Sequence, residues 1–411
     1  MSVLKALVLA GGAPQIALIE ELKRRNIFTI LADYNENPVA RKHADLFYQV
    51  STLDVEAIMK VAQKEQVDFL ITVCTDQALL TVAYVSEQLD LPCYIDYQTA
   101  LNVTNKSYMK KIFAENGIPS AKHVIMSEFA DERIKELSYP LMVKPVDCNS
   151  SKGVKKVYDY EELKKAFDEA TLLSRTKAAV IEEFIDGVEL SVDVYVEDGL
   201  AHVLSVSRLD KMDNVDKFII YRSSCPAKEA GVIADNIHEV AQCIADAFDL
   251  KNTPMLIQMI VREGRIYVLE FSARTGGGEK YIVIKKMSGF DVIKAVVDLT
   301  LGIKPHVDEC SRKRKYIVSE FVYCMPGEFQ RLEGFEEAKR NGLISEYESY
   351  KWKGARFNTV ESSGDRVAGY SIEAATQEEL FGKHRTIMKM IKVIDSKGND
   401  MMRRDHITDL V

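Results

Sequence analysis

Short apolar runs alternate with amphipathic stretches over the first hundred residues. LKALVLA, IFTILAD and VDFLITVC each hold enough aliphatic residues for a buried strand. Helical patterns at about 14–25 and 54–65 separate these runs. Because strands that alternate with helices build doubly wound sheets, we expect residues 1–102 to form an α/β unit with a parallel sheet.

The pattern changes in the middle of the chain. SYMKKIFAENG predicts a helix that ends at Gly117, before Pro119. Strand and hairpin patterns then extend over residues 139–206, and helices are expected at about 229–248 and 289–301. This mixture predicts an α+β unit.

The C-terminal hundred residues combine two strand patterns, KYIVSEFVYC and RVAGYSIEAA, with a helix at about 376–391. At 411 residues the chain is too long for one ordinary core. We therefore expect a third unit, again α+β, at the C-terminal end.

A hairpin pattern at 258–278, QMIVREGRIYVLEFSARTGGG, contains polar residues at regular positions. Side chains alternate between the two faces of a strand, so a turn centred on Gly264 would set Gln258 opposite Glu270. The face they share also holds Ile260, Val268, Ser272 and Arg274, and the core face holds Ile257, Met259, Val261, Tyr267, Leu269 and Phe271. The pattern fits either an edge hairpin with one solvated face or a site where Gln258 and Glu270 share a ligand.

Composition and charge narrow the class of protein. The chain is 47% hydrophobic and 28% charged, with a net charge of −8, which is typical of a soluble globular protein. Its only basic cluster is SRKRK at 311–315, so we expect no nucleic-acid partner. We find no run long enough to span a membrane, no signal-peptide pattern, no CxxC pair and no HxxxH spacing, and we expect a reduced cytoplasmic protein without a zinc site.

The first turn, AGGAPQ, invites a dinucleotide-binding interpretation because glycines let a pyrophosphate approach a helix N-terminus. The GxGxxG spacing is absent, and Pro14 removes one amide donor, which favours a plain turn. Asp33, at the end of the second strand, fits a ribose ligand or a cap of the next segment equally well.

Two lysines suggest an anionic ligand in the middle unit. Lys106 precedes a helical pattern, and Lys144 interrupts the apolar strand pattern YPLMVKPV, where a buried cation needs an anion or a path to solvent. The loop VDCNSSKGV follows at 146–154, with amides and hydroxyls that could cover phosphates. VIEEFIDGVELSVDV, at 180–194, then adds an acidic pair, an apolar pair and a further acid.

In this order, the motifs resemble those of the ATP-grasp superfamily over about residues 1–305. They are NKSYMKKIFAENGIP, YPLMVKPV, the small-residue loop, VIEEFIDGVE and QMIVREGRIYVLEFSARTGG. Within the superfamily the chain resembles carbamoyl-phosphate-synthase-like and L-amino-acid-ligase-like proteins, and GLISEYESYKWKGARFN near its end resembles the C-terminal domain of L-amino acid ligases. The resemblance implies a pre-ATP-grasp substrate domain at 1–102, a two-lobed ATP-grasp domain at 103–305 with a lid subdomain at about 120–187, and a C-terminal α+β cap at 306–411.

The resemblance also implies roles for individual residues, with ATP and Mg²⁺, or Mn²⁺ in its place, as cofactors. Lys106 and Lys144 would bind the phosphates, and the loop at 150–153, with Ser150, Ser151 and Gly153, would close over them. The adenine would lie against Glu182, Glu183, Phe184 and Ile185, and Glu189 would hold the ribose. The metal ligands would be Gln258, Glu270 and Ser272, and Arg274 would face the transferred phosphoryl group, acting with Lys144 and Glu270 in catalysis.

Two proposed metal ligands depart from the usual family pattern. Gln258 stands where an acid is common, and Ser272 stands where asparagine is common, so Glu270 is the only anionic ligand. One carboxylate is enough for an ion that takes its other ligands from phosphates and water.

Asp76, in CTDQAL, follows a predicted parallel strand, where ligands of doubly wound sheets collect. We interpret it as a contact for a substrate amino group, and an N-cap of the next helix is the alternative.

These observations favour an ATP-dependent carboxylate–amine ligase that forms an acyl phosphate and joins it to an amine such as an amino acid. The alternatives are a bicarbonate-using carboxylase or carbamoyl-phosphate-type enzyme, a non-catalytic nucleotide-binding protein, and an NAD-dependent oxidoreductase. We expect small-molecule carboxylate and amine substrates, no membrane partner, and a homodimer.

Overall fold

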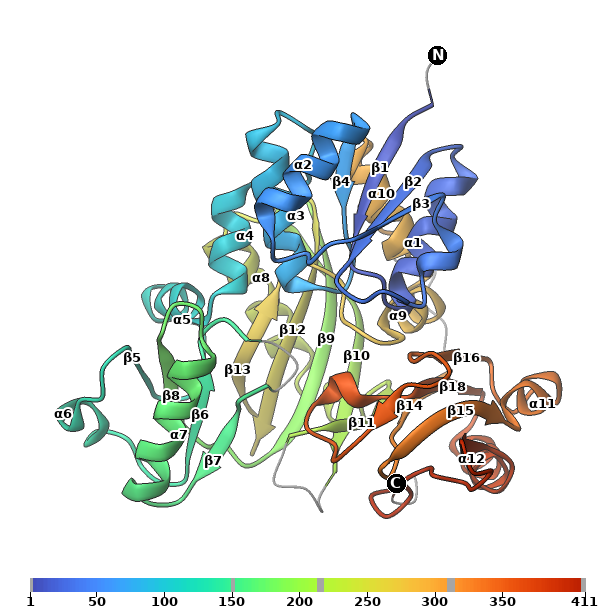
Figure 1. Ribbon diagram of the computed structural model, residues 1–411. Helices are drawn as coiled ribbons and strands as arrows, with labels where there is room; N and C mark the ends of the chain where they lie inside the picture. The colour runs from blue at the N-terminus through green and yellow to red at the C-terminus, as the bar shows by residue number, and fades with distance from the viewer. Residues whose placement is uncertain (1–2, 149–151, 213–217, 309–314, 408–411) are drawn as a thin grey trace.

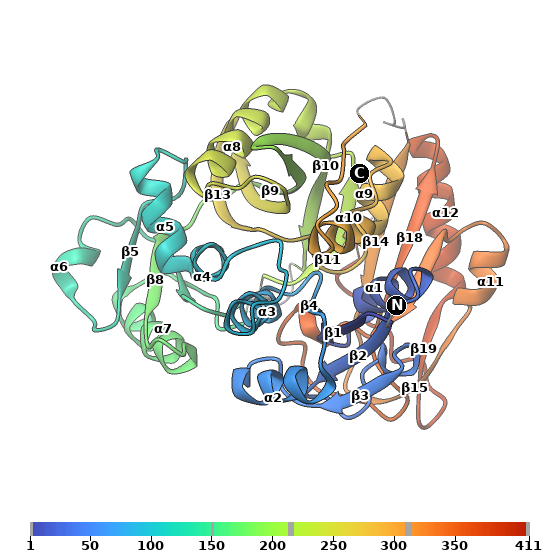
Figure 2. The same ribbon diagram turned by 90° about the horizontal axis from the view of Figure 1, so that it is seen from above.

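The computed structural model describes residues 3–148, 152–212, 218–308 and 315–407 (Figures 1 and 2). Its described strands form four sheets, one of them parallel and the others antiparallel. The expected combination of an α/β unit with α+β units is confirmed.

The N-terminal unit is a parallel sheet with helices on both faces. Its strand order is β3-β2-β1-β4, with bounds β1 (Lys5–Leu9), β2 (Phe28–Asp33), β3 (Leu46–Gln49) and β4 (Phe69–Ile71). The predicted helices are present as α1 (Ala13–Arg24) and α2 (Val55–Glu65). The helix α3 (Asp76–Gln88) packs beside α2.

A helix from much later in the chain covers one face of this sheet. The helix α10 (Val292–Thr300) packs against α1, and its Ile293, Val296 and Val297 join the same buried cluster as Val8 and Ile71. The N-terminal sheet therefore buries one face partly through residues outside 1–102.

A small antiparallel sheet, which we call the lid sheet, lies to one side of the molecule (Figure 1). Its order is β5-β8-β6-β7, with bounds β5 (His123–Met126), β6 (Leu141–Pro145), β7 (Lys155–Val157) and β8 (Ala179–Glu183). The short helix α6 (Asp131–Ile134) follows β5. The helices α4 (Tyr97–Thr104) and α5 (Lys106–Glu115) lead into the lid sheet from the N-terminal unit.

The expectation of only strands and hairpins at 139–206 was wrong, because the helix α7 (Tyr160–Leu173) covers the lid sheet. Asp159 accepts a hydrogen bond from the backbone N–H of Glu162, and the Glu162 side chain accepts one from Tyr158 N. This Asp-x-x-Glu capping pattern starts a helix. Apolar residues at helical spacing then pack on the sheet, namely Leu163, Ala166, Phe167 and Ala170.

The central sheet has eight antiparallel strands in the order β13-β12-β9-β10-β11-β14-β18-β16. Its first five strands in the chain are β9 (Val188–Glu197), β10 (Leu200–Lys211), β11 (Ile220–Cys225), β12 (Thr253–Arg262) and β13 (Arg265–Ser272). The helices α8 (Ala234–Ala247) and α9 (Lys280–Ser288) pack against it. The predicted helix at 229–248 begins later than expected, after a 3₁₀ turn at Lys228–Gly231.

The C-terminal residues extend this same sheet. They add β14 (Tyr316–Val322), β16 (Glu346–Ser349) and β18 (Ala368–Ala374), of which β14 and β18 were predicted. A separate three-stranded sheet, β17-β15-β19, consists of β15 (Gly327–Glu333), β17 (Arg356–Phe357) and β19 (Lys392–Asp395). The helices are α11 (Phe335–Arg340) and the predicted α12 (Gln377–Met390).

The predicted pairing of Gln258 with Glu270 across the β12–β13 hairpin is confirmed. The turn is a two-residue one at Glu263 and Gly264, both with positive φ, and a bulge shifts the register between Gln258 and Met259. The predicted faces of Val268 and Leu269 were wrong, because Val268 is fully buried in the core and Leu269 lines a cavity. Met259 and Phe271 lie in the core as predicted.

No helix within the described residues is both long and apolar enough to cross a membrane.

Candidate active site

Two cavities meet at the hairpin. The lid cavity lies between the lid sheet and the central sheet, and the central cavity, of about 400 Å³, lies between the N-terminal unit, the hairpin and the C-terminal strands. Gln258 and Glu270 line both cavities. A ligand in one cavity can therefore meet a ligand in the other at this point.

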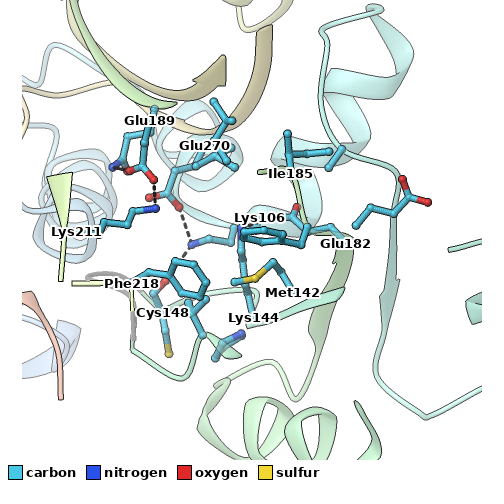
Figure 3. A pocket seen from close by; sticks show the side chains of 18 of the residues that line it. Lys106, Met142, Lys144, Cys148, Glu182, Ile185, Glu189, Lys211, Phe218 and Glu270 are labelled. Atoms are coloured by element: carbon cyan, nitrogen blue, oxygen red, sulfur yellow. Dashed lines mark hydrogen bonds and ion pairs between the residues drawn. The ribbon is translucent and has the colours of Figure 1, made fainter. Parts of the chain in front are cut away.

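Lys106 and Glu270 form an ion pair at the junction (Figure 3). The Lys106 Nζ lies 3.1 Å from Glu270 Oε2 and donates a hydrogen bond of 2.9 Å to the carbonyl of Cys148. Asn105, the N-cap of α5, holds the start of this helix through Ser107 N. Burial alone would raise the pKa of Glu270, but the charges of Lys106 and Lys144 lower it, so this carboxylate is ionised.

A buried triad of Lys110, Glu182 and Lys144 connects α5 with β8 and β6. Lys144 donates to Glu182 Oε1, and Lys110 Nζ lies 3.1 Å from Glu182 Oε2. Burial opposes ionisation, but the two lysines together lower the pKa of Glu182 to about 2. The triad carries two positive charges and one negative charge, which leaves the wall of the lid cavity suited to an anion.

Lys110 was not among the residues predicted from the sequence. It lies four residues after Lys106 in one helix, a spacing that sets both side chains on the same face. That spacing was a usable signal. The predicted adenine residue Glu182 lines the lid cavity, but both of its carboxyl oxygens face lysines.

The other predicted adenine residues form the apolar part of the lid cavity. Glu183 also lines this cavity, and its side chain accepts a hydrogen bond of 3.0 Å from the backbone N–H of Ser138, a residue outside the lining. The Phe184 and Phe218 ring centroids are 6.3 Å apart, and Lys156 Nζ lies 3.5 Å from the Phe184 centroid. The apolar lining includes Met142, Phe184, Ile185, Phe218, Ile220, Ile260 and Leu269.

Glu189, the predicted ribose ligand, lies on the opposite wall (Figure 3). It is paired with Lys211, and Gln258 Nε2 donates to Glu189 Oε1 at 3.4 Å. Lys211 was missed by the sequence analysis. Only the antiparallel pairing of β9 with β10 brings it near Glu189, and no local pattern indicates this contact.

Asp76, Ser272 and Arg274 form one cluster at the wall of the central cavity. Arg274 holds both carboxyl oxygens of Asp76, with its Nε 2.7 Å from Oδ1, and Ser272 donates to the same oxygen. Burial would raise the pKa of Asp76, but Arg274 lowers it. Asp76 is the first residue of α3, and Thr75 occupies the N-cap position.

Two of the loop residues named in the sequence analysis, Ser150 and Ser151, lie outside the described residues. Gly153 is described and has a φ of +74°. A Cβ there would lie 2.6 Å from Leu173 Cδ1, so both the backbone conformation and the available space favour glycine.

Asp33 makes contact with the glycine turn that follows β1. Asp33 Oδ2 accepts a hydrogen bond of 2.7 Å from Gly11 N, and Asp33 Oδ1 accepts one of 2.7 Å from Asn35 N. Asp33 thus caps its own turn, which agrees with the plain-turn interpretation.

Part of the chain matches a known protein family. A family model described as an ATP-grasp domain matches residues 137–282, a range that includes Lys144, Glu182 and the whole hairpin. An ATP-grasp domain is therefore present at residues 137–282. This matched range supplies the lid sheet's β6 to β8 and most of the central sheet.

Two relatives and one solved structure show how far the similarity extends. The carbamoyl phosphate synthase large chain of Thermoanaerobacter sp. is 30% identical over 192 residues, which are 45% of this chain and 17% of that protein. The phosphoribosylamine–glycine ligase of Lactococcus lactis is 23% identical over 325 residues, 74% of this chain and 77% of the relative. The L-amino acid ligase from Bacillus licheniformis has a TM-score of 0.78 at 23% identity, covering 96% of this chain and 100% of that one.

This last likeness shows a shared fold. The chain spans 24% of the carbamoyl phosphate synthase large chain of Clostridium acetobutylicum and 17% of that of Thermoanaerobacter sp.. These matches therefore indicate a shared ATP-grasp fold. They do not show that this chain has the activity of any of these proteins.

Proposed function

We propose that the chain is an ADP-forming, ATP-dependent carboxylate–amine ligase. The observation that supports this most directly is that Gln258 and Glu270 line both cavities. A nucleotide in the lid cavity would present its terminal phosphate to a substrate in the central cavity at this junction. Transfer of a phosphoryl group needs such contact between the two ligands.

The lid cavity suits a nucleotide in each of its parts. Met142, Phe184 and Phe218 offer an apolar slot for a base, and Glu189 offers a carboxylate for ribose hydroxyls. Lys106 and Lys144 offer charge for the phosphates, and Lys144 stays protonated because Glu182 raises its pKa despite burial. These roles of the residues, and ATP as the nucleotide, are part of the proposal.

The residues at the junction fit a magnesium ion that shares its ligands with phosphates. Glu270 supplies one carboxylate, and Gln258 and Ser272 add an amide and a hydroxyl oxygen, which are ligand types that Mg²⁺ accepts. No group of three or more His, Cys, Asp or Glu residues forms a metal site within the described parts of the chain. Bound Mg²⁺, or Mn²⁺, would neutralise charge on the β and γ phosphates.

In the proposed first step, a carboxylate oxygen of the substrate bonds to the γ-phosphorus while the bond to the β-γ bridging oxygen breaks. This gives an acyl phosphate and ADP. Arg274 would stabilise the charge on the transferred group, because a guanidinium can hold two oxygens at once. An amine then displaces phosphate and forms the amide.

The hypothesis that Asp76 receives the substrate amino group stays a prediction. Both oxygens of Asp76 are held by Arg274, which supports a positioning role for this carboxylate. The two roles differ in the measurable effect of Asp76→Asn: loss of an amine contact raises the KM of the amine, whereas loss of positioning lowers kcat.

The similarity to carbamoyl phosphate synthase chains supports a second candidate, in which bicarbonate takes the place of the organic carboxylate. In that case ADP release depends on bicarbonate and does not need an organic acid.

The experiment that tests the proposal is a measurement of ADP release with Mg·ATP and pools of amino acids, other carboxylates, amines or bicarbonate. We expect release only when a carboxylate and an amine are both present. Release with bicarbonate alone would support the second candidate. Nucleotide binding by calorimetry without ADP release in any pool would support a non-catalytic nucleotide-binding protein, and sedimentation of the same samples tests the predicted homodimer.

A further inference from the structure

The central cavity continues past Arg274, along the glycine run at 276–278. Gly278 has a φ of +67°, and a Cβ there would lie 2.9 Å from the Phe321 ring and 3.6 Å from an Arg366 guanidinium nitrogen. Glu279 follows directly and begins the helix α9 as its N-cap residue. Because these glycines have no side chains, the cavity remains open here, and Glu279, Phe321 and Arg366 line it.

Glu279 is a buried acid at the wall of this cavity, with 2% of its surface exposed. Ser371 donates to its Oε2, and its Oε1 has no hydrogen bond of ordinary geometry among the described residues. No lysine or arginine in the described part of the chain forms an ion pair with it. A buried carboxyl in this state costs free energy unless it is neutral or meets a cation.

Arg366 is the matching cation. Its guanidinium lies 3.6 Å from the Phe321 ring centroid, and it donates to Tyr323 Oη at 3.1 Å and to the carbonyl of Ile220 at 3.4 Å. None of these partners is a carboxylate, and within the described residues it forms no ion pair. Tyr350 lies within electrostatic reach of both Arg366 and Glu279, which places the two charges in one neighbourhood.

The other charged groups of this cavity have partners of opposite charge. Arg274 is paired with Asp76, Glu270 with Lys106, and Lys280 with Asp193 at 3.5 Å. Glu279 and Arg366 are thus the carboxyl group and the cation of this cavity that form no ion pair within the described residues. A ligand that carries both an ammonium and a carboxylate group meets both needs.

We infer that Glu279 and Arg366 form the subsite for the amine substrate, that this substrate is an amino acid, and that Glu279 accepts its proton. The inference rests on the proposed ligase function. Arg366 binds the amino acid's carboxylate, and Oε1 of Glu279 binds its ammonium group. The glycine run gives the amino group access to the junction at Arg274 and Glu270.

The proton and electron balance of the step is simple. One ammonium proton passes to Glu279, which becomes a neutral carboxylic acid. The free lone pair of the nitrogen bonds to the carbonyl carbon of the acyl phosphate, and the carbon–oxygen bond to phosphate breaks with its electrons on oxygen. The second nitrogen proton leaves with the phosphate, so that the products are the amide and hydrogen phosphate.

The surroundings of Glu279 suit a group that takes a proton from an amine. Burial raises the pKa of Glu279 to about 8, the charge of Glu348 adds to this effect, and the hydroxyls of Ser371 and Ser319 and the charge of Lys286 oppose it. The neighbouring Tyr281 and Tyr350 remain neutral, because burial raises the pKa of both hydroxyls. The ammonium group of a bound amino acid favours the ionised form of Glu279. The carboxylate can then take back a proton from the nitrogen, because its pKa lies close to that of the donor.

The first test separates the amine step from the carboxylate step by using hydroxylamine, which is uncharged at neutral pH. Hydroxylamine traps the acyl phosphate as a hydroxamate and needs no proton acceptor for an ammonium group. In Glu279→Gln we expect hydroxamate formation close to that of the wild type, with a loss of at least about tenfold in kcat/KM for the amino acid. Glu346→Gln is the control, because Glu346 is a half-buried acid on β16 that is paired with Lys339 at 2.8 Å and lies outside the cavity lining, and this variant should keep both activities.

The outcomes distinguish the two proposals. No hydroxamate from the wild type with any carboxylate would mean that the ligase proposal fails. Hydroxamate from both enzymes, with amino-acid ligation by Glu279→Gln within about twofold of the wild type, would overturn the role of Glu279.

The second test concerns Arg366. The wild type should prefer an amino acid over its methyl ester, which lacks the carboxylate charge. In Arg366→Gln the two should become equal, through an at least about tenfold loss for the acid and little change for the ester. A preserved preference for the acid would remove Arg366 from the subsite.

Discussion

At the residue scale, the positive charge of the lid cavity comes from lysines whose side chains are fixed by ion pairs with acidic side chains. Lys144 is largely buried on β6 and paired with Glu182, which also forms an ion pair with Lys110. A phosphate group would therefore meet a cation whose position is already set. Such preorganisation lowers the cost of ordering a long side chain on binding.

Lys144→Ala should weaken the binding of Mg·ATP at least about tenfold, because a cation on the phosphates is lost. The fold should persist, since Glu182 keeps Lys110 as its partner. Titration calorimetry measures the affinity. Lys155→Ala is the control, since Lys155 lies on the neighbouring strand in an exposed pair with Glu169. Equal affinities of the Lys144→Ala and Lys155→Ala proteins would contradict the assignment.

In the proposed mechanism, Arg274 would act on the transferred phosphoryl group. Its planar guanidinium group donates two hydrogen bonds to the carboxylate of Asp76, a geometry that a lysine cannot reproduce. Arg274→Lys should keep most of the ATP affinity and lose about a hundredfold or more in kcat, as expected for a group that stabilises the transition state. Parallel measurements of kcat and nucleotide Kd check this, and a defect confined to ATP affinity would refute the role.

At the element scale, the lid sheet is tied to α5 by one buried carboxylate. Glu182 on β8 contacts Lys144 on β6 and Lys110 on α5, so the lid sheet and the helix share an electrostatic contact as well as a covalent connection.

Glu182→Gln should lower the free energy of unfolding by about 3 kcal/mol or more, because two buried cations lose their anion. The pKa of Glu182 is lowered from the ordinary 4.5 to about 2, so its contribution to stability is present above pH 4.5 and is lost as the pH falls toward 2. Urea unfolding from pH 7 down to pH 3 measures this. The difference between wild type and variant should shrink toward acid pH, and a constant difference would show that the ionised carboxylate is not its source.

At the scale of the whole molecule, the sheets cross the limits suggested by the sequence. The central sheet continues from β11 into β14 and β18, beyond residue 305, and α10 covers the N-terminal sheet. The central cavity also takes lining residues from all three regions, such as Asp76, Glu270 and Phe321. The proposed active site therefore depends on the whole chain.

A chain that ends at residue 305 should not unfold cooperatively, because β11 would lose its partner β14 and present an open edge. Thermal unfolding followed by circular dichroism tests this expectation against the full chain. A soluble 1–305 protein with a sharp transition and the ATP affinity of the full chain would show that the C-terminal region is an independent cap.

The sequence by itself determined what depends on near neighbours in the chain. Alternation of apolar runs and helical patterns was enough for the N-terminal parallel sheet, and ordered motifs were enough for the superfamily. The pairing of Gln258 with Glu270 was also predicted, although a two-residue turn and a bulge together produce it. The capping pattern of Asp159 and Glu162 was equally local and was overlooked.

Only the tertiary structure decided the contacts between distant residues. Asp76 and Arg274 lie 198 positions apart, and Lys211 meets Glu189 only because β9 pairs with β10. The same holds for Glu279, whose sequence position shows neither its burial nor its missing partner. The physical reason is that hydrophobic periodicity and capping act within a few residues, whereas the ionisation and the partners of a buried charge are set by whatever the folded chain packs around it.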